Sequence, residues 1–317
     1  MRARTVFGMM VLGIAATGAV CAQSYPVKPI RIVTSEAGGG NDIVARLVGQ
    51  QLASGLGQSV VVENRPAGVI PGEIVSRAQA DGYTMLLYGG SFWVAPLVQD
   101  VPYDVVRDFA PIVLIASTPN VLVVTPSLPV KSVGELIALA KSKPGAFNYA
   151  STSTGAPNHL AAELFKFMAG VNLLRVPYRG TAPAMNDLMS GQVHAMFAIA
   201  AAAMPHVRSG RLTALAVTSR EPSVLAPGLP TVAASGLPGY EIAALYGAFF
   251  PVKTQATLIQ RLNQEIVRII ARKEIVDRMF NVGLETVGST PEQFAAKIKS
   301  EMAVFGKLIK NAGIRRD

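Results

Sequence analysis

Ile30-Arg31-Ile32-Val33-Thr34-Ser35-Glu36-Ala37-Gly38-Gly39-Gly40-Asn41-Asp42 is the stretch of sequence that decides the fold of this chain. Its first four residues are mostly β-branched, which favours a β-strand. Beyond it, apolar residues recur at helical spacing, so a helix follows, capped by Asn41 or Asp42. The three glycines therefore predict a strand-to-helix turn of the kind that α/β proteins use.

The same alternation of strands and helices continues along the chain. Strands are predicted at 60–62, 83–88, 121–124, 148–150, 173–176, 193–197 and 214–217, with helices at 72–80, 133–141, 159–168 and 183–190. Strands separated by helices indicate parallel α/β layers. The C-terminal third is mostly helical, and Thr290-Pro291-Glu292-Gln293 is typical of a helix start with a capping box. We expect these last helices to pack on the first domain.

The length of the chain predicts two domains. Of its 317 residues, 295 remain after an N-terminal segment of 22, which is too many for one ordinary core. We expect residues 23–123 with 246–317 to form the first domain and residues 124–245 the second. No low-complexity linker separates them in the sequence, so short strands should cross between the domains. The candidates for this hinge are 121–126 and 241–251.

The N-terminus reads as a secretory signal. Arg2 and Arg4 precede an uncharged run to Val20, which is shorter than the roughly 20 residues that span a bilayer. We expect a signal peptide at 1–22, cleavage after Ala22 and a periplasmic location. A lipoprotein acylated at Cys21 is the competing interpretation, although Val20 fits that pattern poorly. Cleavage would remove the only cysteine, and with it any disulfide or thiol chemistry.

Composition and motifs exclude several classes of function. Loss of Arg2 and Arg4 lowers the net charge from +9 to +7, and the remaining charges are scattered, so a nucleic-acid partner is not expected. The three histidines show no metal-ligand spacing, and no dinucleotide or P-loop fingerprint follows the glycines. No GxSxG or HExxH motif is present. We therefore predict no enzyme, no cofactor and no metal.

Two turns have the design of an anion site. The first is the triple glycine, where backbone can approach a ligand and the next helix directs unpaired N–H groups at it. The second is Ser151-Thr152-Ser153-Thr154-Gly155, which precedes a helix near His159. Each turn alone is equally consistent with ordinary strand-to-helix geometry or hydroxyl capping. Together they predict an anion held between two helix N-termini.

Three further segments are candidates for the same site. Ser91-Phe92-Trp93 follows a predicted strand, and the single tryptophan either lines the cleft or lies in the core. Tyr178 and Arg179 open another helix, where the arginine could pair with an anion or lie on the surface. His159 could donate to a ligand, although a capping or packing role is more usual at a helix start.

At this point the sequence resembles a known family. The motifs are Tyr25-Pro26-Val27-Lys28-Pro29-Ile30-Arg31, Gly38-Gly39-Gly40, Asp42-Ile43-Val44-Ala45-Arg46, Val61-Val62-Glu63-Asn64-Arg65-Pro66, Asp81-Gly82-Tyr83-Thr84, Pro119-Asn120-Val121-Leu122, His159-Leu160-Ala161-Ala162-Glu163-Leu164-Phe165, Val176-Pro177-Tyr178-Arg179-Gly180 and Leu237-Pro238-Gly239-Tyr240. In this order they resemble the Bug/TctC family, the periplasmic receptors of tripartite tricarboxylate transporters. The resemblance covers essentially the whole chain after residue 22.

The resemblance implies a type 2 periplasmic-binding-protein fold, in which two α/β domains joined by a two-strand hinge close on a ligand. It also implies that ligand carboxylates are held by the two turns described above. The ligand-binding residues that it implies are Ala37, Gly38, Gly39, Gly40, Asn41, Asp42, Ser91, Ser151, Thr152, Ser153, Thr154, Gly155, Ala156, Asn158, His159, Tyr178 and Ala198.

Several residues depart from the family pattern. Glu36 precedes the glycines, where it would repel a carboxylate if it faced the cleft. Pro157 removes one N–H donor from the second turn. Ala198 stands where the family usually has an Asp that meets the amine of amino-acid ligands. These changes argue against aspartate and glutamate and favour a less polar carboxylate, with aromatic acids among the candidates.

The resulting prediction is a monomeric binding protein that delivers a small carboxylate to membrane permease subunits. One alternative is a ligand carrier that docks on a signalling receptor. Another alternative is a secreted hydrolase that uses the cluster Ser151–Thr154 with His159.

Overall fold

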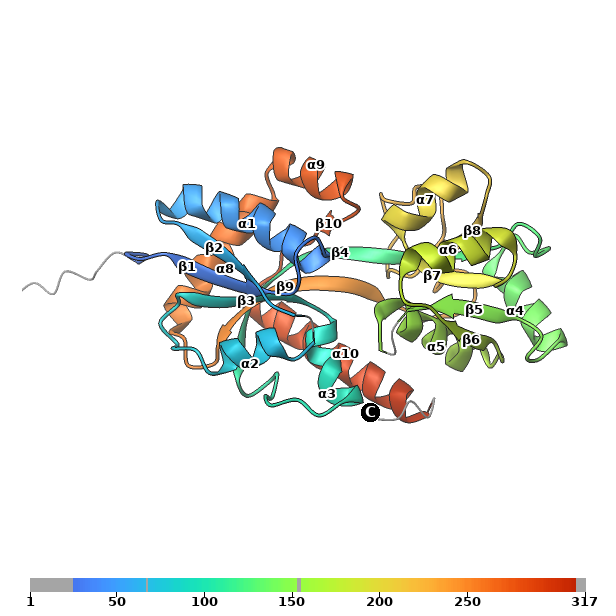
Figure 1. The fold of residues 1–317 in the computed structure, drawn as a ribbon, viewed down its shortest axis with the longest axis horizontal. Coiled ribbons are helices and arrows are strands. Elements are labelled where there is room, and N and C mark those ends of the chain that lie inside the picture. The colour runs from blue at the N-terminus through green and yellow to red at the C-terminus, as the bar shows by residue number, and fades with distance from the viewer. Residues whose placement is uncertain (1–24, 67, 153–154, 312–317) are drawn as a thin grey trace, which may run out of the picture.

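The computed structural model describes residues 25–66, 68–152 and 155–311. The predicted signal peptide at 1–22 and the two hydroxyl residues Ser153 and Thr154 lie outside them. Figure 1 shows two lobes, each with a sheet and helices, joined by two long strands. Among the described helices, none combines the length and hydrophobicity needed to cross a bilayer.

The first lobe is built on a mixed sheet. Strands β2 (Val60–Asn64), β1 (Ile30–Thr34) and β3 (Thr84–Gly89) are parallel neighbours in that order. β9 (Ala243–Pro251) pairs antiparallel with β3 and with the first part of β4 (Phe109–Val124), and the short β10 (Glu285–Thr286) also pairs with β4. The alternation of β1 divides its side chains between two cores: Ile30 and Ile32 face one, Val33 the other.

Helices cover both faces of this sheet (Figure 1). On the side of Ile30 and Ile32 the core takes in α1 (Gly40–Leu56), α8 (Ala256–Ile270) and α9 (Lys273–Asn281). On the side of Val33 it takes in α2 (Ile70–Ser76), α3 (Ser91–Val98) and α10 (Pro291–Asn311). The prediction that the C-terminal helices pack on the first domain is therefore confirmed for α8 and for the first half of α10, where Phe294 is fully buried.

The second lobe continues from the far end of β4. There β4 pairs antiparallel with β7 (Ala195–Ile199) and β8 (Thr213–Val217), while β5 (Asn148–Ser151) is parallel to β7 and to β6 (Leu174–Pro177). The helices of this lobe are α4 (Val133–Ser142), α5 (Pro157–Ala169), α6 (Thr181–Ser190) and α7 (Ala200–Arg208).

The chain crosses between the sheets at two points. β4 pairs with β9 as far as Pro119 and with β7 from Asn120 onward. The return crossing follows Ile242, whose N–H donates to the Thr218 carbonyl before β9 begins. The first crossing thus precedes the predicted hinge at 121–126, because those residues are already part of the second sheet. The division into domains at 123/124 and 245/246 stays a prediction.

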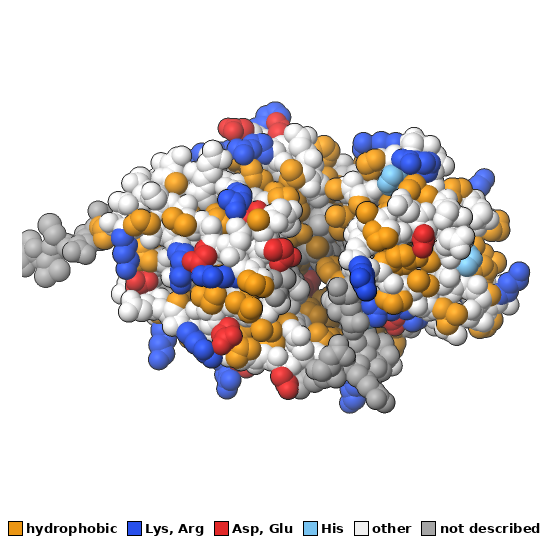
Figure 2. All heavy atoms as spheres, viewed as in Figure 1, with side chains coloured by type: hydrophobic (Ala, Val, Ile, Leu, Met, Phe, Trp, Pro, Cys, Tyr) orange, Lys and Arg blue, Asp and Glu red, His pale blue; other side chains and the backbone are white. Residues whose placement is uncertain are grey.

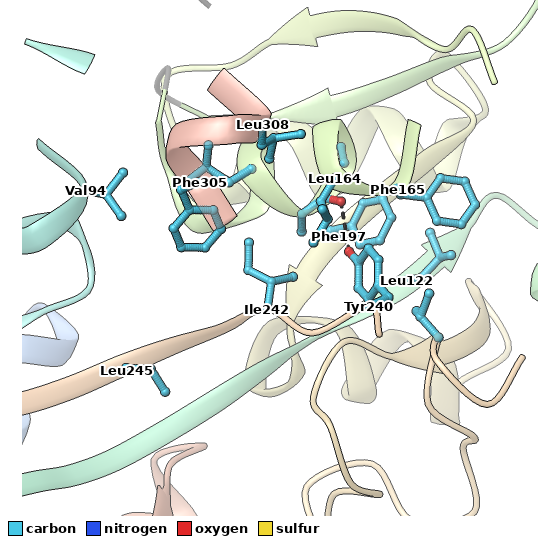
Figure 3. Close-up of a cluster of buried hydrophobic side chains, with 14 of the residues drawn as sticks. Val94, Leu122, Leu164, Phe165, Phe197, Tyr240, Ile242, Leu245, Phe305 and Leu308 are labelled. Atoms are coloured by element: carbon cyan, nitrogen blue, oxygen red, sulfur yellow. Dashed lines mark hydrogen bonds between the residues drawn. The ribbon is translucent and has the colours of Figure 1, made fainter. Parts of the chain in front are cut away.

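Helix α10 forms a third link between the lobes. Its second half places Phe305 and Leu308 beside Leu164 of α5, near Ile242 at the return crossing (Figure 3). The start of α10 is confirmed as a capping box, since the Thr290 hydroxyl accepts from the Gln293 N–H at 3.2 Å and the Gln293 side chain accepts from the Thr290 N–H at 3.0 Å.

One local expectation was wrong, and the structure decides one alternative that the sequence left open. The N-cap of α1 is Gly39, with extended backbone, rather than Asn41 or Asp42, which lie inside the first helical turn. Trp93 does not line a cleft: it is fully buried and packs against Phe249 and Phe294. The segment that contains it is the helix α3, which was not predicted and which includes Pro96.

Candidate ligand-binding cleft

The β1–α1 turn is held in shape by Asp42. The carboxylate of this buried residue accepts from the Gly38 N–H at 2.9 Å, the Asn64 side chain at 2.8 Å and Arg46 at 2.9 Å. Burial raises the pKa of the Asp42 carboxyl, but the hydrogen bonds from Arg46, Gly38 and Asn64 outweigh it, so the net pKa is lowered. Asp42 is therefore an ionised structural group whose charge its neighbours compensate.

Gly40 lies where this turn meets the rest of the first lobe. A Cβ at Gly40 would lie 2.4 Å from the Tyr246 hydroxyl, so only glycine fits there without movement. Asn41 donates to the Ser35 hydroxyl at 3.0 Å, while its own side-chain oxygen is buried and has no hydrogen-bond partner within the described residues. Ala37 and Gly38 are exposed.

The β5–α5 turn repeats this design with different groups. The Gly155 N–H donates to Nδ1 of His159 at 3.1 Å, and the Asn158 side chain accepts from the Thr152 hydroxyl at 3.0 Å. Burial, and then the nearby charge of Arg175, lower the pKa of His159 to about 4. His159 is thus a neutral capping residue, and its Nδ1 carries a lone pair rather than a proton.

Arg175 on β6 stabilises the same turn through hydrogen bonds of its side chain. Its guanidinium donates to the Ser151 hydroxyl and to the Thr152 carbonyl, both at 2.8 Å. The hydroxyl of Ser151 is therefore engaged by a cation rather than by His159, which does not favour the nucleophile that a hydrolase would need. The motif reading missed Arg175, although its position two residues before Pro177 on a strand next to β5 could have indicated it.

The β5–α5 turn and helix α3 share a cavity of about 480 Å³ between the lobes. Figure 2 shows the surface hollowed at this boundary. The second lobe contributes Gly155, Ala156 and Pro157; the first contributes Gly68, Tyr88, Ser91, Val94, Ala95, Val98 and Gln99. Of these, the sequence predicted Ser91, Gly155 and Ala156 as ligand-binding residues.

The triple glycine does not line this cavity, although the next residue, Asn41, lies close to the strand that carries the lining residue Tyr88. A Cβ at Gly89, next to the α3 segment, would lie 3.1 Å from the Asn41 side-chain oxygen. The charge of Glu36 reaches Tyr88: burial raises the pKa of the tyrosine, a hydrogen bond with Gly68 lowers it, and Glu36 raises it further. Glu36 itself is exposed.

Other predicted site residues lie away from the cavity walls. Tyr178 donates its hydroxyl to Asp187 of α6 at 2.7 Å. Ala198 is buried in the second sheet, where it pairs with Val121. Within the described residues, no group of His, Cys, Asp and Glu side chains is placed to hold a metal ion.

A second cavity, of about 420 Å³, lies between α5 and α10. A narrow extension lined by Ser91, Gly155, Glu301 and Phe305, among others, lies between the two cavities. Glu301 is buried there and accepts from the Trp93 indole at 2.8 Å. Burial raises the pKa of Glu301 to about 7, against the lowering effects of Trp93 and Lys297.

Comparison with known proteins relates this sequence and fold to a known family. Residues 44–314 match the family described as "Tripartite tricarboxylate transporter family receptor". The protein BugT of Bordetella pertussis is 33% identical over 99% of this chain and 98% of its own length. The structure of R. palustris Rpa4515 with adipate superposes with a TM-score of 0.75 at 33% identity, covering 91% of this chain and 98% of that one. MatC from Rhodopseudomonas palustris, with bound malate, gives 0.72 at 26% identity, covering 90% and 100%.

These matches confirm the predicted periplasmic-binding-protein fold and the resemblance that the motifs indicated. The family and these structural neighbours are solute-binding proteins rather than enzymes. The chain belongs to the TctC receptor family, whose members are periplasmic solute-binding proteins.

Proposed function

We propose that this chain captures a small carboxylate in the cleft between its lobes and delivers it to the permease subunits of a tripartite tricarboxylate-type transporter. Two relatives of known structure were solved with adipate and with malate, both small carboxylates. The proposal includes export by the signal peptide at 1–22, a periplasmic monomer and the division into domains given above.

One observation carries the proposal: the cavity of about 480 Å³ is lined by residues of both lobes. Its volume lies within the range of small-molecule sites, about 300–1,000 Å³. Because β4 and β9 are the strands that connect the sheets, a rotation about the two crossings would change this cavity more than either core. A ligand that contacts both walls would therefore favour the closed arrangement.

The carboxylate is proposed to meet backbone N–H groups at the two helix starts. Helical bonding begins with the Ile43 N–H in α1 and the Leu160 N–H in α5. By helix geometry, the N–H groups of Gly40, Asn41 and Asp42 have no acceptor within α1. In α5 only Asn158 and His159 offer such groups, since Pro157 has none. The hydroxyls of Ser91 and Ser151 are proposed as further donors, whereas the Thr152 hydroxyl already donates to Asn158. Ser153 and Thr154 stay proposed ligand residues outside the described part of the chain.

Mass spectrometry of small molecules that co-purify with the protein tests this function, followed by a thermal-shift screen of mono-, di- and tricarboxylates. A ligand at a hundredfold excess over its Kd should raise the free energy of unfolding by about 2.7 kcal/mol. The proposal fails if no carboxylate in the screen shifts Tm while an amine or a sugar does.

A further inference from the structure

One face of α3 forms the first-lobe wall of the cleft. Ser91, Val94, Ala95, Val98 and Gln99 all line the cavity. The spacing of Ser91, Val94, Ala95 and Val98 places them on a single side of the helix, and Gln99 follows as its C-cap residue. Between the polar residues Ser91 and Gln99, three apolar side chains line the cavity, those of Val94, Ala95 and Val98.

The opposite wall is also apolar and comes close to α3. Ala156 and Pro157 line it from the second lobe. A Cβ at Gly155 would lie 3.6 Å from a methyl group of Val98, which is van der Waals distance. The two lobes therefore nearly touch beside Val98, so a ligand would contact Val98 where the cavity closes rather than pass between Val98 and Gly155.

The charges around the cavity favour a single negative group on the ligand. None of the described residues that line it is Asp, Glu, Lys or Arg. The nearby cation is Arg175, which donates to Ser151 and Thr152 at the β5–α5 turn. At the other end, the negative charge of Glu36 acts on Tyr88. A second carboxylate extending toward Tyr88 would lose its hydration and meet repulsion.

We infer that the cleft selects a monocarboxylate with a hydrocarbon body, whose carboxylate lies at the β5–α5 turn and whose body lies along Val94, Ala95 and Val98. This inference rests on the proposed function and adds the chemical class of the ligand. Each buried methylene should tighten binding by about fourfold, whereas each further carboxylate should weaken it.

Calorimetric titration with three six-carbon acids tests the inference, because hexanoate, adipate and citrate carry one, two and three carboxylates. We expect Kd to rise in that order, with citrate at least tenfold weaker than hexanoate, and butanoate, which has two methylenes fewer, about 16-fold weaker than hexanoate. Tighter binding of adipate or citrate than of hexanoate would overturn the inference while leaving the proposed function intact. Binding of none of the four acids would count against the proposed function itself.

Two substitutions at α3 and its C-cap test two features separately: the apolar wall, and the lack of a cation among the described residues that line the cavity. Val98→Thr keeps the shape and adds a hydroxyl, so hexanoate should bind several-fold more weakly. Gln99→Lys supplies a cation at the end of α3 and should raise the affinity for adipate relative to hexanoate by about tenfold. Val304→Thr on α10 is the matched control: it is 44% exposed and lines the other cavity. Unchanged ligand preference in both α3 variants would contradict the inference.

Discussion

The N–H of Gly155 donates to Nδ1 of His159, four residues further along the chain, at 3.1 Å. The same spacing recurs in the first lobe, where the Gly38 N–H donates to Asp42 at 2.9 Å. Both glycines have left-handed backbone, with φ of +78° and +83°. In each turn, therefore, a side chain from the following helix accepts a hydrogen bond from the backbone of the glycine.

This contact predicts an acid sensitivity of the β5–α5 turn. Burial and the charge of Arg175 lower the pKa of His159 from 6.5 to about 4, so the unfolded state binds this proton more readily between those values. The contribution of neutral His159 to the free energy of unfolding is complete above about pH 6.5 and is lost as the pH falls toward 4. A protonated Nδ1 also cannot accept from Gly155. The free energy of unfolding, measured with urea between pH 4 and 7, should therefore fall more steeply with decreasing pH in the wild type than in His159→Asn. The asparagine side chain can accept from the Gly155 N–H without titrating. Parallel pH profiles would contradict this role of His159.

The buried Glu301 predicts a stability that changes with pH in the opposite direction, over an overlapping pH range. Burial, opposed by Trp93 and Lys297 and assisted by Glu241, raises its pKa from 4.5 to about 7. The folded state then holds the proton more tightly, so stability falls as the pH rises from about 4.5 through 7 and stays lower above.

Replacement of Glu301 by Gln should remove this slope, since a neutral amide still accepts from the Trp93 indole. At pH 8 we expect the variant to be more stable than the wild type by on the order of 1–3 kcal/mol. Glu274→Gln, at a side chain that is 74% exposed, is the control and should change stability by less than about 0.5 kcal/mol. A destabilised Glu301→Gln protein at pH 8 would show that the charge itself is needed.

Adjacent glycines in the first turn should respond differently to alanine. A Cβ at Gly40 would lie 2.4 Å from the Tyr246 hydroxyl, so Gly40→Ala should cost about 1–3 kcal/mol and weaken ligand binding. At Gly39 the nearest atom would be 3.7 Å away and φ is −81°, so Gly39→Ala should cost less than about 1 kcal/mol. Chemical denaturation of the two variants checks the difference; equal losses would show that crowding at Tyr246 is not the cause.

The two turns and most strands could be predicted because their signals are local. Glycine runs, hydroxyl clusters and β-branched stretches mark β1, β5 and the helices behind them. The shared i to i+4 contact of Gly38 with Asp42 and of Gly155 with His159 could have been inferred from the equal spacing in the sequence. The capping box at Thr290 was found in this way.

The wall of the cleft could not be predicted, because its signals are tertiary. No helix was predicted for the α3 segment, which contains Pro96. The apolar residues Val94 and Val98 look the same in a sequence whether they face a core or a ligand. Trp93 took the core position through its contacts with Phe249, Phe294 and Glu301, which lie more than 150 residues away in the chain. The sequence predicted only the last four residues of β4 as a strand, whereas β4 continues through Pro119 from one sheet to the other.

A crystal structure with a carboxylate that the thermal-shift screen identifies is the most direct test of interdomain capture. We predict that the carboxylate lies at the N–H groups of Asn158 and His159 and that the rest of the molecule contacts Val94 and Val98 across the cleft. A ligand bound instead in the cavity between α5 and α10, or on one lobe alone, would contradict capture in the cleft between the lobes.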